Sequence, residues 1–174
     1  MINRMVPDRY AVSAYAVDYD ALYAEGVRGI IFDIDNTLVE PNAPADERSV
    51  RLFGRLHRMG FQTVILSNNT GERARVFASA VGSRVVAWAM KPLPYKYRTA
   101  MKVMGTDKTS TVFIGDQLYT DIWGANNAGI TSILTVPLTD REEFWIRWKR
   151  RLEEPVRRRL KPEPLPQGKE EHAE

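Results

Sequence analysis

The sequence contains no cysteine and few histidines, and the first shortage limits its chemistry most. Its 174 residues include no Cys and two His. Without thiols, the chain cannot form disulfides, thiolate zinc sites, iron–sulfur clusters or cysteine nucleophiles. This composition fits a reducing compartment.

Long apolar runs are also missing. The longest uncharged run, from Ile122 to Thr139, includes two Asn and Pro137 and is too polar to span a bilayer. Near the N-terminus, the short apolar patch at residues 10–17 lacks the strongly basic flank of a signal peptide. We therefore expect a cytoplasmic protein, with peripheral attachment to the inner face of the membrane left open.

The remaining composition is that of a globular protein. Hydrophobic residues make up 44% and charged residues 27%, both ordinary values. The length suggests one domain, since a domain averages roughly 150 residues. The net charge is +3, but residues 147–161 hold eight basic and two acidic residues. This asymmetry indicates an anionic surface or a phosphate-rich partner near the C-terminus.

Short apolar runs alternate with helical patterns through the middle of the chain. The runs predict strands at residues 27–32, 63–66, 84–88, 111–114 and 132–136, and the patterns predict helices at 46–59, 72–81, 94–104 and 120–128. A glycine follows each helix, where a left-handed cap favours it: Gly60, Gly82, Gly105 and Gly129. We expect an α/β, Rossmann-like fold with a mostly parallel sheet of about five strands and helices on both faces.

Polar residues with reactive side chains follow four of these strands. They are Asp33, Asp35, Ser67, Lys91, Asp116 and Asp121. Ligands of open α/β sheets bind at the carboxyl ends of the strands, so these residues should meet at one rim. Close carboxylates repel by about 4 kcal/mol per pair at an intermediate dielectric. A hard divalent cation, most plausibly Mg2+, would relieve this repulsion and take the four aspartates as ligands.

Each residue also has a simpler interpretation. An Asp-x-Asp pair is usually a solvated turn, Ser67 and the later aspartates could cap helices, and Lys91 could be a surface lysine. The coincidence of all of them at strand ends favours a site. There, one carboxylate of the first pair could attack phosphorus while the other transfers the proton.

The strings DIDNTLV at 33–39 and GDQLYTD at 115–121, with Ser67 and Lys91 between them, resemble the four ordered motifs of the haloacid dehalogenase (HAD) phosphohydrolase superfamily. The resemblance implies that Asp33 is a nucleophile that forms an aspartyl-phosphate and that Asp35 is the general acid/base. It implies a phosphate-binding set made of Thr37, Ser67, Asn68 and Lys91, with Lys91 also catalytic. It implies a metal set made of Asp33, Asp35, Asp116 and Asp121.

The spacing of these motifs leaves no room for a cap domain. Asp33 and Ser67 are 34 positions apart, and Ser67 and Lys91 are 24 apart, whereas a domain needs at least about 50 residues. The site should therefore be open. An open site suits a substrate whose bulk stays outside, such as a lipid headgroup, a nucleic-acid end or a protein, while a small metabolite would need an oligomer to close the pocket.

A closer resemblance covers residues 5 to 160. GIIFDIDNTLV, LSNN, Lys91-Pro92-Leu93 and GDQLYTDIWGANNAG are similar to the capless IIIA-type phosphatases of the phosphatidylglycerophosphatase kind. This resemblance implies Mg2+-dependent dephosphorylation of phosphatidylglycerophosphate to phosphatidylglycerol. Apolar residues recur every four positions within residues 144–161 and basic residues fill other positions, which is typical of an interfacial helix on an anionic membrane. Packing of that helix on the body of the protein fits the pattern equally well.

Four segments follow from these patterns: an N-terminal helical arm packed on the core (1–26), a HAD phosphatase core (27–140), a basic amphipathic helix (141–160) and a flexible tail (161–174).

Two other functions stay open. One is a phosphatase for nucleic-acid 3′ ends or soluble phosphosugars, although the body shows no groove of stacking aromatics and we expect no nucleic acid as partner. The other is a non-catalytic HAD-fold binding protein, which the complete motif set disfavours. The sequence does not indicate an oligomeric state.

Overall fold

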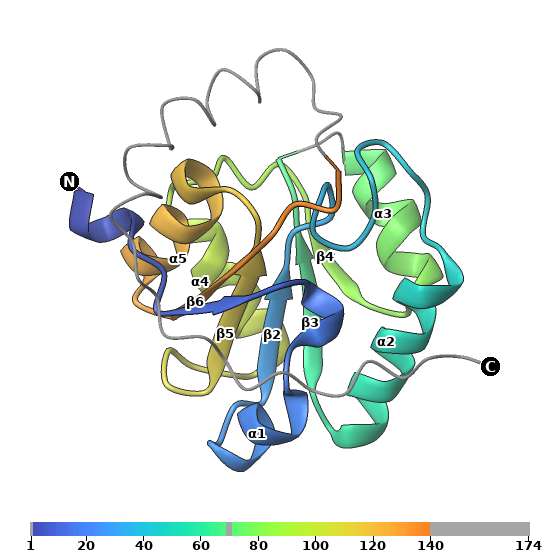
Figure 1. Cartoon of the computed structure of the whole chain (residues 1–174), viewed down its shortest axis with the longest axis horizontal. Helices are drawn as coiled ribbons and strands as arrows, with labels where there is room; N and C mark the ends of the chain where they lie inside the picture. Colours follow the sequence, from blue (N-terminus) through green and yellow to red (C-terminus); the bar gives the residue numbers. More distant parts are fainter. Residues whose placement is uncertain (1, 69–70, 140–174) are drawn as a thin grey trace.

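The computed structural model describes residues 2–68 and 71–139, which build one parallel six-stranded sheet (Figure 1). The strands are β1 (Arg9–Ala11), β2 (Gly29–Phe32), β3 (Gln62–Leu66), β4 (Arg84–Val86), β5 (Thr111–Gly115) and β6 (Thr131–Thr135). Their order across the sheet is β1-β6-β5-β2-β3-β4, and each neighbouring pair is parallel. The predicted α/β fold is confirmed, with one strand more than expected.

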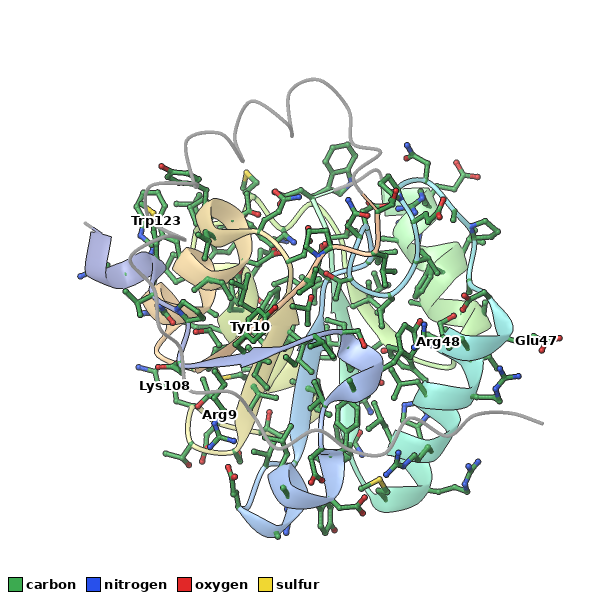
Figure 2. All side chains as sticks on the ribbon, viewed as in Figure 1. Arg9, Tyr10, Glu47, Arg48, Lys108 and Trp123 are labelled. Carbon is green, nitrogen blue, oxygen red and sulfur yellow. The ribbon has the colours of Figure 1, made fainter. Side chains whose placement is uncertain are left out.

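The additional strand is β1, at the edge of the sheet beside β6. Sequence patterns predicted a helical arm here, but the segment combines the 3-10 turns η1 (Ile2–Met5) and η2 (Ala14–Ala16) and the short helix α1 (Tyr19–Ala24) with this strand. The carboxylate of Asp8 fixes the strand by accepting from the backbone N–H of Ser132 at 2.8 Å and from its hydroxyl at 3.0 Å. Tyr10 and Trp123 both pack on a small apolar cluster at this side of the molecule (Figure 2).

Four further helices cover the two faces of the sheet: α2 (Glu47–Met59), α3 (Gly71–Ala80), α4 (Tyr95–Met104) and α5 (Trp123–Ala128). The alternation of side chains along β2 separates the two layers. Ile30 and Phe32 pack in one apolar cluster with Phe53 of α2 and Phe77 of α3. Ile31 packs on the opposite face in a second cluster that includes residues of α4 and α5. The helices therefore lie on both faces, as predicted, with α2 and α3 together on one side (Figure 1).

The helix ends follow the chemistry of their capping residues. Asp46 caps α2, because its side chain accepts from the backbone N–H of Ser49 at 2.7 Å. The four glycines expected at helix ends all have left-handed backbones: Gly60, Gly82, Gly105 and Gly129, with φ of 97°, 70°, 70° and 77°. One prediction was imprecise. The last helix begins with a π-helical turn, η3 (Leu118–Ile122), before α5.

Two sequence predictions fall on residues that the structure does not describe. The basic amphipathic helix at 141–160 and the flexible tail at 161–174 both lie outside the described residues. Within residues 2–68 and 71–139, no helix combines the length and apolarity needed to cross a bilayer.

Candidate active site

Three neighbouring strands deliver polar side chains to one edge of the sheet. Asp33, Ser67 and Asp116 each follow the last residue of β2, β3 and β5, respectively. The strands are in register, since Phe32 is level with Ile65 on one side and with Ile114 on the other. These three positions therefore lie at a common rim, as the sequence predicted.

Three carboxylates form a compact group that we call the Asp cluster: Asp33, Asp116 and Asp121. One oxygen from each lies within 4.8 Å of the other two. All three residues are buried, with 6%, 0% and 0% of their surface exposed. Buried like charges need a cation, and a set of hard oxygen ligands matches the preference of Mg2+. The donor chemistry therefore fits the predicted metal, and these three side chains are its candidate ligands.

Lys91 inserts its ammonium group into this arrangement from the loop after β4. Its Nζ lies 2.6 Å from Oδ1 of Asp33 and 2.6 Å from Oδ1 of Asp121, and its side chain is 4% exposed. Asn68 fixes the loop, because its side-chain oxygen accepts from the backbone N–H of Lys91 at 2.8 Å. The surface-lysine interpretation therefore does not apply.

For each of Asp33 and Lys91, burial and the neighbouring charge shift the pKa in opposite directions. Burial raises the pKa of Asp33 to about 7, although the ammonium of Lys91 opposes this shift. Burial alone would lower the pKa of Lys91, but Asp121 and Asp33 together raise it above its usual value. Lys91 thus stays charged at neutral pH, and it provides a permanent cation beside the carboxylate of Asp33.

Asp35 is not one of the three carboxylates of the Asp cluster. Its carboxylate forms a bidentate ion pair with Arg73 of α3, with nitrogen–oxygen distances of 2.8 and 3.0 Å. Its Oδ1 also accepts from the backbone N–H of Asn42 at 3.0 Å. Of the four aspartates predicted as metal ligands, three thus gather in the Asp cluster, whereas Asp35 pairs with Arg73; the ligand set itself stays a prediction. Sequence reasoning missed Arg73, which follows no strand and belongs to no quoted motif.

The predicted phosphate-binding residues surround the same rim. Thr37 is buried and donates from its hydroxyl to Oδ1 of Asp116 at 3.3 Å, so it orients a cluster carboxylate. Ser67 is buried, and its carbonyl accepts from the backbone N–H of Ala89 at 3.1 Å. The Thr37 contact joins the loops after β2 and β5, and the contacts of Ser67 and Asn68 join the loops after β3 and β4.

The carboxylate of Asp121 lies very close to the backbone at Gly115. A Cβ on Gly115 would lie 2.5 Å from Oδ2 of Asp121, closer than any real contact. The same oxygen accepts from the backbone N–H of Gln117 at 3.1 Å, and the π-helical turn η3 carries the residue back over β5. Glycine at position 115 is therefore a requirement of the site.

No cap domain covers this edge in the part of the chain that the structure describes. The chain between Phe32 and Gln62 forms a loop and α2, and the chain between Leu66 and Arg84 forms α3. The prediction of an open site agrees with this connectivity.

Comparisons with known proteins show which family the chain belongs to. The model of haloacid dehalogenase-like hydrolases matches residues 42–129. A Bacillus subtilis (strain 168) protein named "Probable phosphatase YqeG" is 34% identical over 157 residues, covering 90% of this chain and 91% of that protein. This chain belongs to the haloacid dehalogenase-like hydrolase family. With these relatives, we assign the HAD chain to the phosphoric monoester hydrolases.

Two further relatives of this HAD hydrolase are longer proteins. Phosphatidylglycerophosphate phosphatase 1, chloroplastic/mitochondrial, from Arabidopsis thaliana is 29% identical over 79% of this chain and 42% of its own length. The chloroplastic enzyme of the same name from Chlamydomonas reinhardtii is 32% identical over 79% of this chain and 55% of its own. The chain thus spans about half of each.

Solved structures support the HAD fold alone. The cobalt-bound deoxy-D-mannose-octulosonate 8-phosphate phosphatase from Haemophilus influenzae superposes with a TM-score of 0.54 at 14% identity, covering 77% of this chain and 89% of that one. An uncharacterized protein from Listeria monocytogenes serotype 4b gives 0.53 at 22% identity, covering 67% and 85%.

Proposed function

We propose that this chain is a Mg2+-dependent phosphomonoesterase that works through an aspartyl-phosphate on Asp33 and converts phosphatidylglycerophosphate to phosphatidylglycerol. The observation that carries the chemistry is the position of Asp33. Its carboxylate belongs to the buried Asp cluster and contacts the ammonium of Lys91 at 2.6 Å. A nucleophile, a fixed cation and a metal-ligand set thus coincide at one point.

The first half of the reaction transfers the phosphoryl group to the protein. A carboxylate oxygen of Asp33 attacks phosphorus in line, and the bond from phosphorus to the leaving oxygen breaks. Asp35, two residues along the chain, gives its proton to the leaving alkoxide. Lys91 stabilises the charge on the equatorial oxygens. Mg2+, held by Asp33, Asp116 and Asp121, would supply further neutralisation of that charge.

The second half restores the protein. Asp35 takes a proton from a water molecule, which attacks the phosphorus of the aspartyl-phosphate. The bond between phosphorus and the Asp33 oxygen breaks, so inorganic phosphate leaves and the carboxylate returns. Asp35 again carries the proton that the next substrate requires. Thr37, Ser67 and Asn68 join the loops around this centre, and we assign them to phosphate binding.

Two observations support the lipid as substrate. The Arabidopsis and Chlamydomonas relatives are named for phosphatidylglycerophosphate. The edge of the sheet above the Asp cluster carries no cap in the described residues, which suits a headgroup whose acyl chains stay outside. We propose that the protein acts at an anionic membrane surface on the cytoplasmic side, and the basic segment 144–161 is a candidate contact.

The test is phosphate release by the full-length protein with Mg2+ from phosphatidylglycerophosphate in anionic vesicles. Soluble phosphosugars and 3′-phosphorylated oligonucleotides run in parallel, and the Asp33→Asn variant is the control. Selective release from vesicles that Asp33→Asn abolishes supports the proposal. Release only from a soluble substrate rejects the lipid and keeps the phosphatase chemistry. Metal binding without phosphate release from any of these substrates favours the non-catalytic alternative.

A further inference from the structure

The large exposed apolar side chains of the described residues gather at one edge of the sheet. Apart from valines, these side chains are Trp88, Met90, Leu93, Tyr95 and Leu138, with 62%, 56%, 50%, 40% and 36% exposed. We call this set the apolar rim. All five follow the carboxyl end of β4 or of β6, which is the edge that carries the Asp cluster. Valines such as Val50 and Val103 are exposed elsewhere, on α2 and α4.

The loop after β4 points its side chains alternately into the site and away from it. Ala89 and Lys91 are buried, whereas Trp88 and Met90 are exposed. Lys91 reaches Asp33 inside the site, and Met90 is its neighbour in the chain. Consecutive Cα atoms are about 3.8 Å apart, so the apolar rim begins one residue from a predicted phosphate-binding lysine.

The backbone of this loop is fixed in a conformation that few side chains adopt. Trp88 and Met90 have positive φ values of 53° and 47°, which bulky residues rarely show. Hydrogen bonds hold the loop, since the N–H groups of Ala89 and Lys91 donate to Ser67 and Asn68, respectively. The exposure of the large side chains is therefore a feature of the folded loop.

Two cations, Arg75 and Lys96, lie beside aromatic residues of the apolar rim. Trp88 and Arg75 both flank Gly71, where an added Cβ would lie 3.0 Å from the indole nitrogen and 3.3 Å from the guanidinium. The ammonium of Lys96 lies 5.5 Å from the ring of Tyr95. Aromatic and aliphatic side chains flanked by cations are typical of a surface that binds anionic lipid.

We propose that the apolar rim docks this protein on an anionic membrane leaflet, with Trp88, Met90 and Leu93 inserted at the boundary between headgroups and acyl chains. This inference rests on the proposed function and names the element that brings the site to its substrate. A second copy of the chain bound to the apolar rim would block substrate from reaching Lys91. A bilayer bound there would instead bring lipid phosphate groups to Lys91. The rim also needs no shape complementarity to enter a bilayer.

The test compares two variants of the full-length protein that each lose three exposed apolar side chains. The rim variant is Trp88→Asn, Met90→Asn, Leu93→Gln, because Asn is polar and tolerates positive φ. The matched control is Val6→Gln, Val50→Gln, Val103→Gln, which changes exposed valines away from the rim. Co-sedimentation with phosphatidylglycerol–phosphatidylcholine vesicles measures binding. Turnover is measured on phosphatidylglycerophosphate in these vesicles and on a soluble aryl phosphate.

We expect the rim variant to lose vesicle partitioning by about tenfold or more and to lose turnover on vesicles in proportion. It should hydrolyse the aryl phosphate at the wild-type rate, and the valine variant should match the wild type in every assay. Wild-type partitioning of the rim variant overturns the proposal. Dissociation of an oligomer without loss of partitioning also overturns it, since the rim would then be a self-interface.

The assays separate the two proposals. A wild-type protein that hydrolyses the aryl phosphate but not the phospholipid defeats the proposed substrate. Vesicle binding is measured without substrate, so it tests the apolar rim as a docking surface whether or not the protein hydrolyses the phospholipid.

Discussion

Arg73 binds both carboxylate oxygens of Asp35 from α3, at 2.8 and 3.0 Å and across 38 residues of sequence. Lys91, from the loop after β4, contacts one carboxylate oxygen of Asp33, Oδ1, at 2.6 Å. Two aspartates that are two residues apart thus have different cations and different surroundings. Such a division allows neighbouring carboxylates to take different roles in one reaction; the roles of nucleophile for Asp33 and acid/base for Asp35 stay proposals.

Replacing Arg73 should slow the chemical step, because the bidentate pair holds Asp35 in one orientation. We expect Arg73→Gln to lower kcat on a soluble aryl phosphate by about tenfold to a hundredfold. Arg73→Lys should recover only part of this loss, since an ammonium cannot contact both oxygens in the same fork geometry. Steady-state kinetics and the pH profile of kcat provide the readouts. An unchanged kcat and pH profile in Arg73→Gln would contradict a positioning role.

Removing the charge of Asp33 should stabilise the metal-free protein at neutral and higher pH. Burial raises the pKa of Asp33 from 3.8 to about 7. The folded state therefore retains a proton that the unfolded chain releases, and stability falls as pH rises between these two values. Asp33→Asn avoids this loss, which we place at about 4 kcal/mol above about pH 7.

Thermal unfolding in EDTA checks this prediction across pH. The difference in Tm between Asp33→Asn and the wild type should be near zero at about pH 4 and should grow until about pH 7. A difference that does not change with pH would show that the buried carboxylate is not the cause.

Loss of Lys91 should make folding depend on metal. The ammonium contacts Asp33 and Asp121 and is almost fully buried, so Lys91→Met leaves these two buried carboxylates without their cation. We expect a loss of about 3–5 kcal/mol in the free energy of unfolding in EDTA. Mg2+ should recover part of it, because a ligand that binds the folded state stabilises it. Urea unfolding with and without Mg2+ measures both effects, and equal stability of variant and wild type in EDTA would refute the interpretation.

A methyl group at Gly115 should disrupt the site. The added Cβ would lie 2.5 Å from Oδ2 of Asp121, so the carboxylate must move. A displacement of about 1 Å can cost about a hundredfold in rate, and we expect at least that loss in Mg2+-dependent turnover for Gly115→Ala.

Gly54→Ala is the matched control for this substitution. Gly54 lies inside α2, and its nearest atom to an added Cβ is a flexible Arg58 nitrogen at 3.4 Å. Alanine favours a helix interior over glycine by about 1 kcal/mol, so this variant should keep its activity with equal or higher Tm. Similar activity in both variants would mean that the close approach at Gly115 is unimportant.

The features that the sequence predicted are those with local signals. The buried runs and the glycines after helices each act within a few residues, and the structure confirms these elements. The convergence of Asp33, Lys91, Asp116 and Asp121 followed from one topological rule, that parallel strands present their carboxyl ends at one edge. Their catalytic and metal-binding roles stay predictions.

Features that depend on distant partners had no such signal. Strand β1 has three residues, and Arg9 pairs with Ile133 far along the chain. Arg73 resembles any arginine on a helix until the fold brings it to Asp35. The exposure of Trp88 reflects the path of a loop with positive φ, whereas its residue type alone favours burial. Long-range pairing and loop geometry therefore had to be observed.

The central claim is that Asp33 carries the phosphoryl group during turnover. The most direct measurement is to quench the full-length protein in acid while it hydrolyses an aryl phosphate with Mg2+, and to analyse the peptide that contains Asp33 by mass spectrometry. The account predicts an increase equal to one phosphoryl group on Asp33, together with no turnover by Asp33→Asn. Sustained turnover by Asp33→Asn, with no phosphoryl group on this peptide in the wild type, would contradict it.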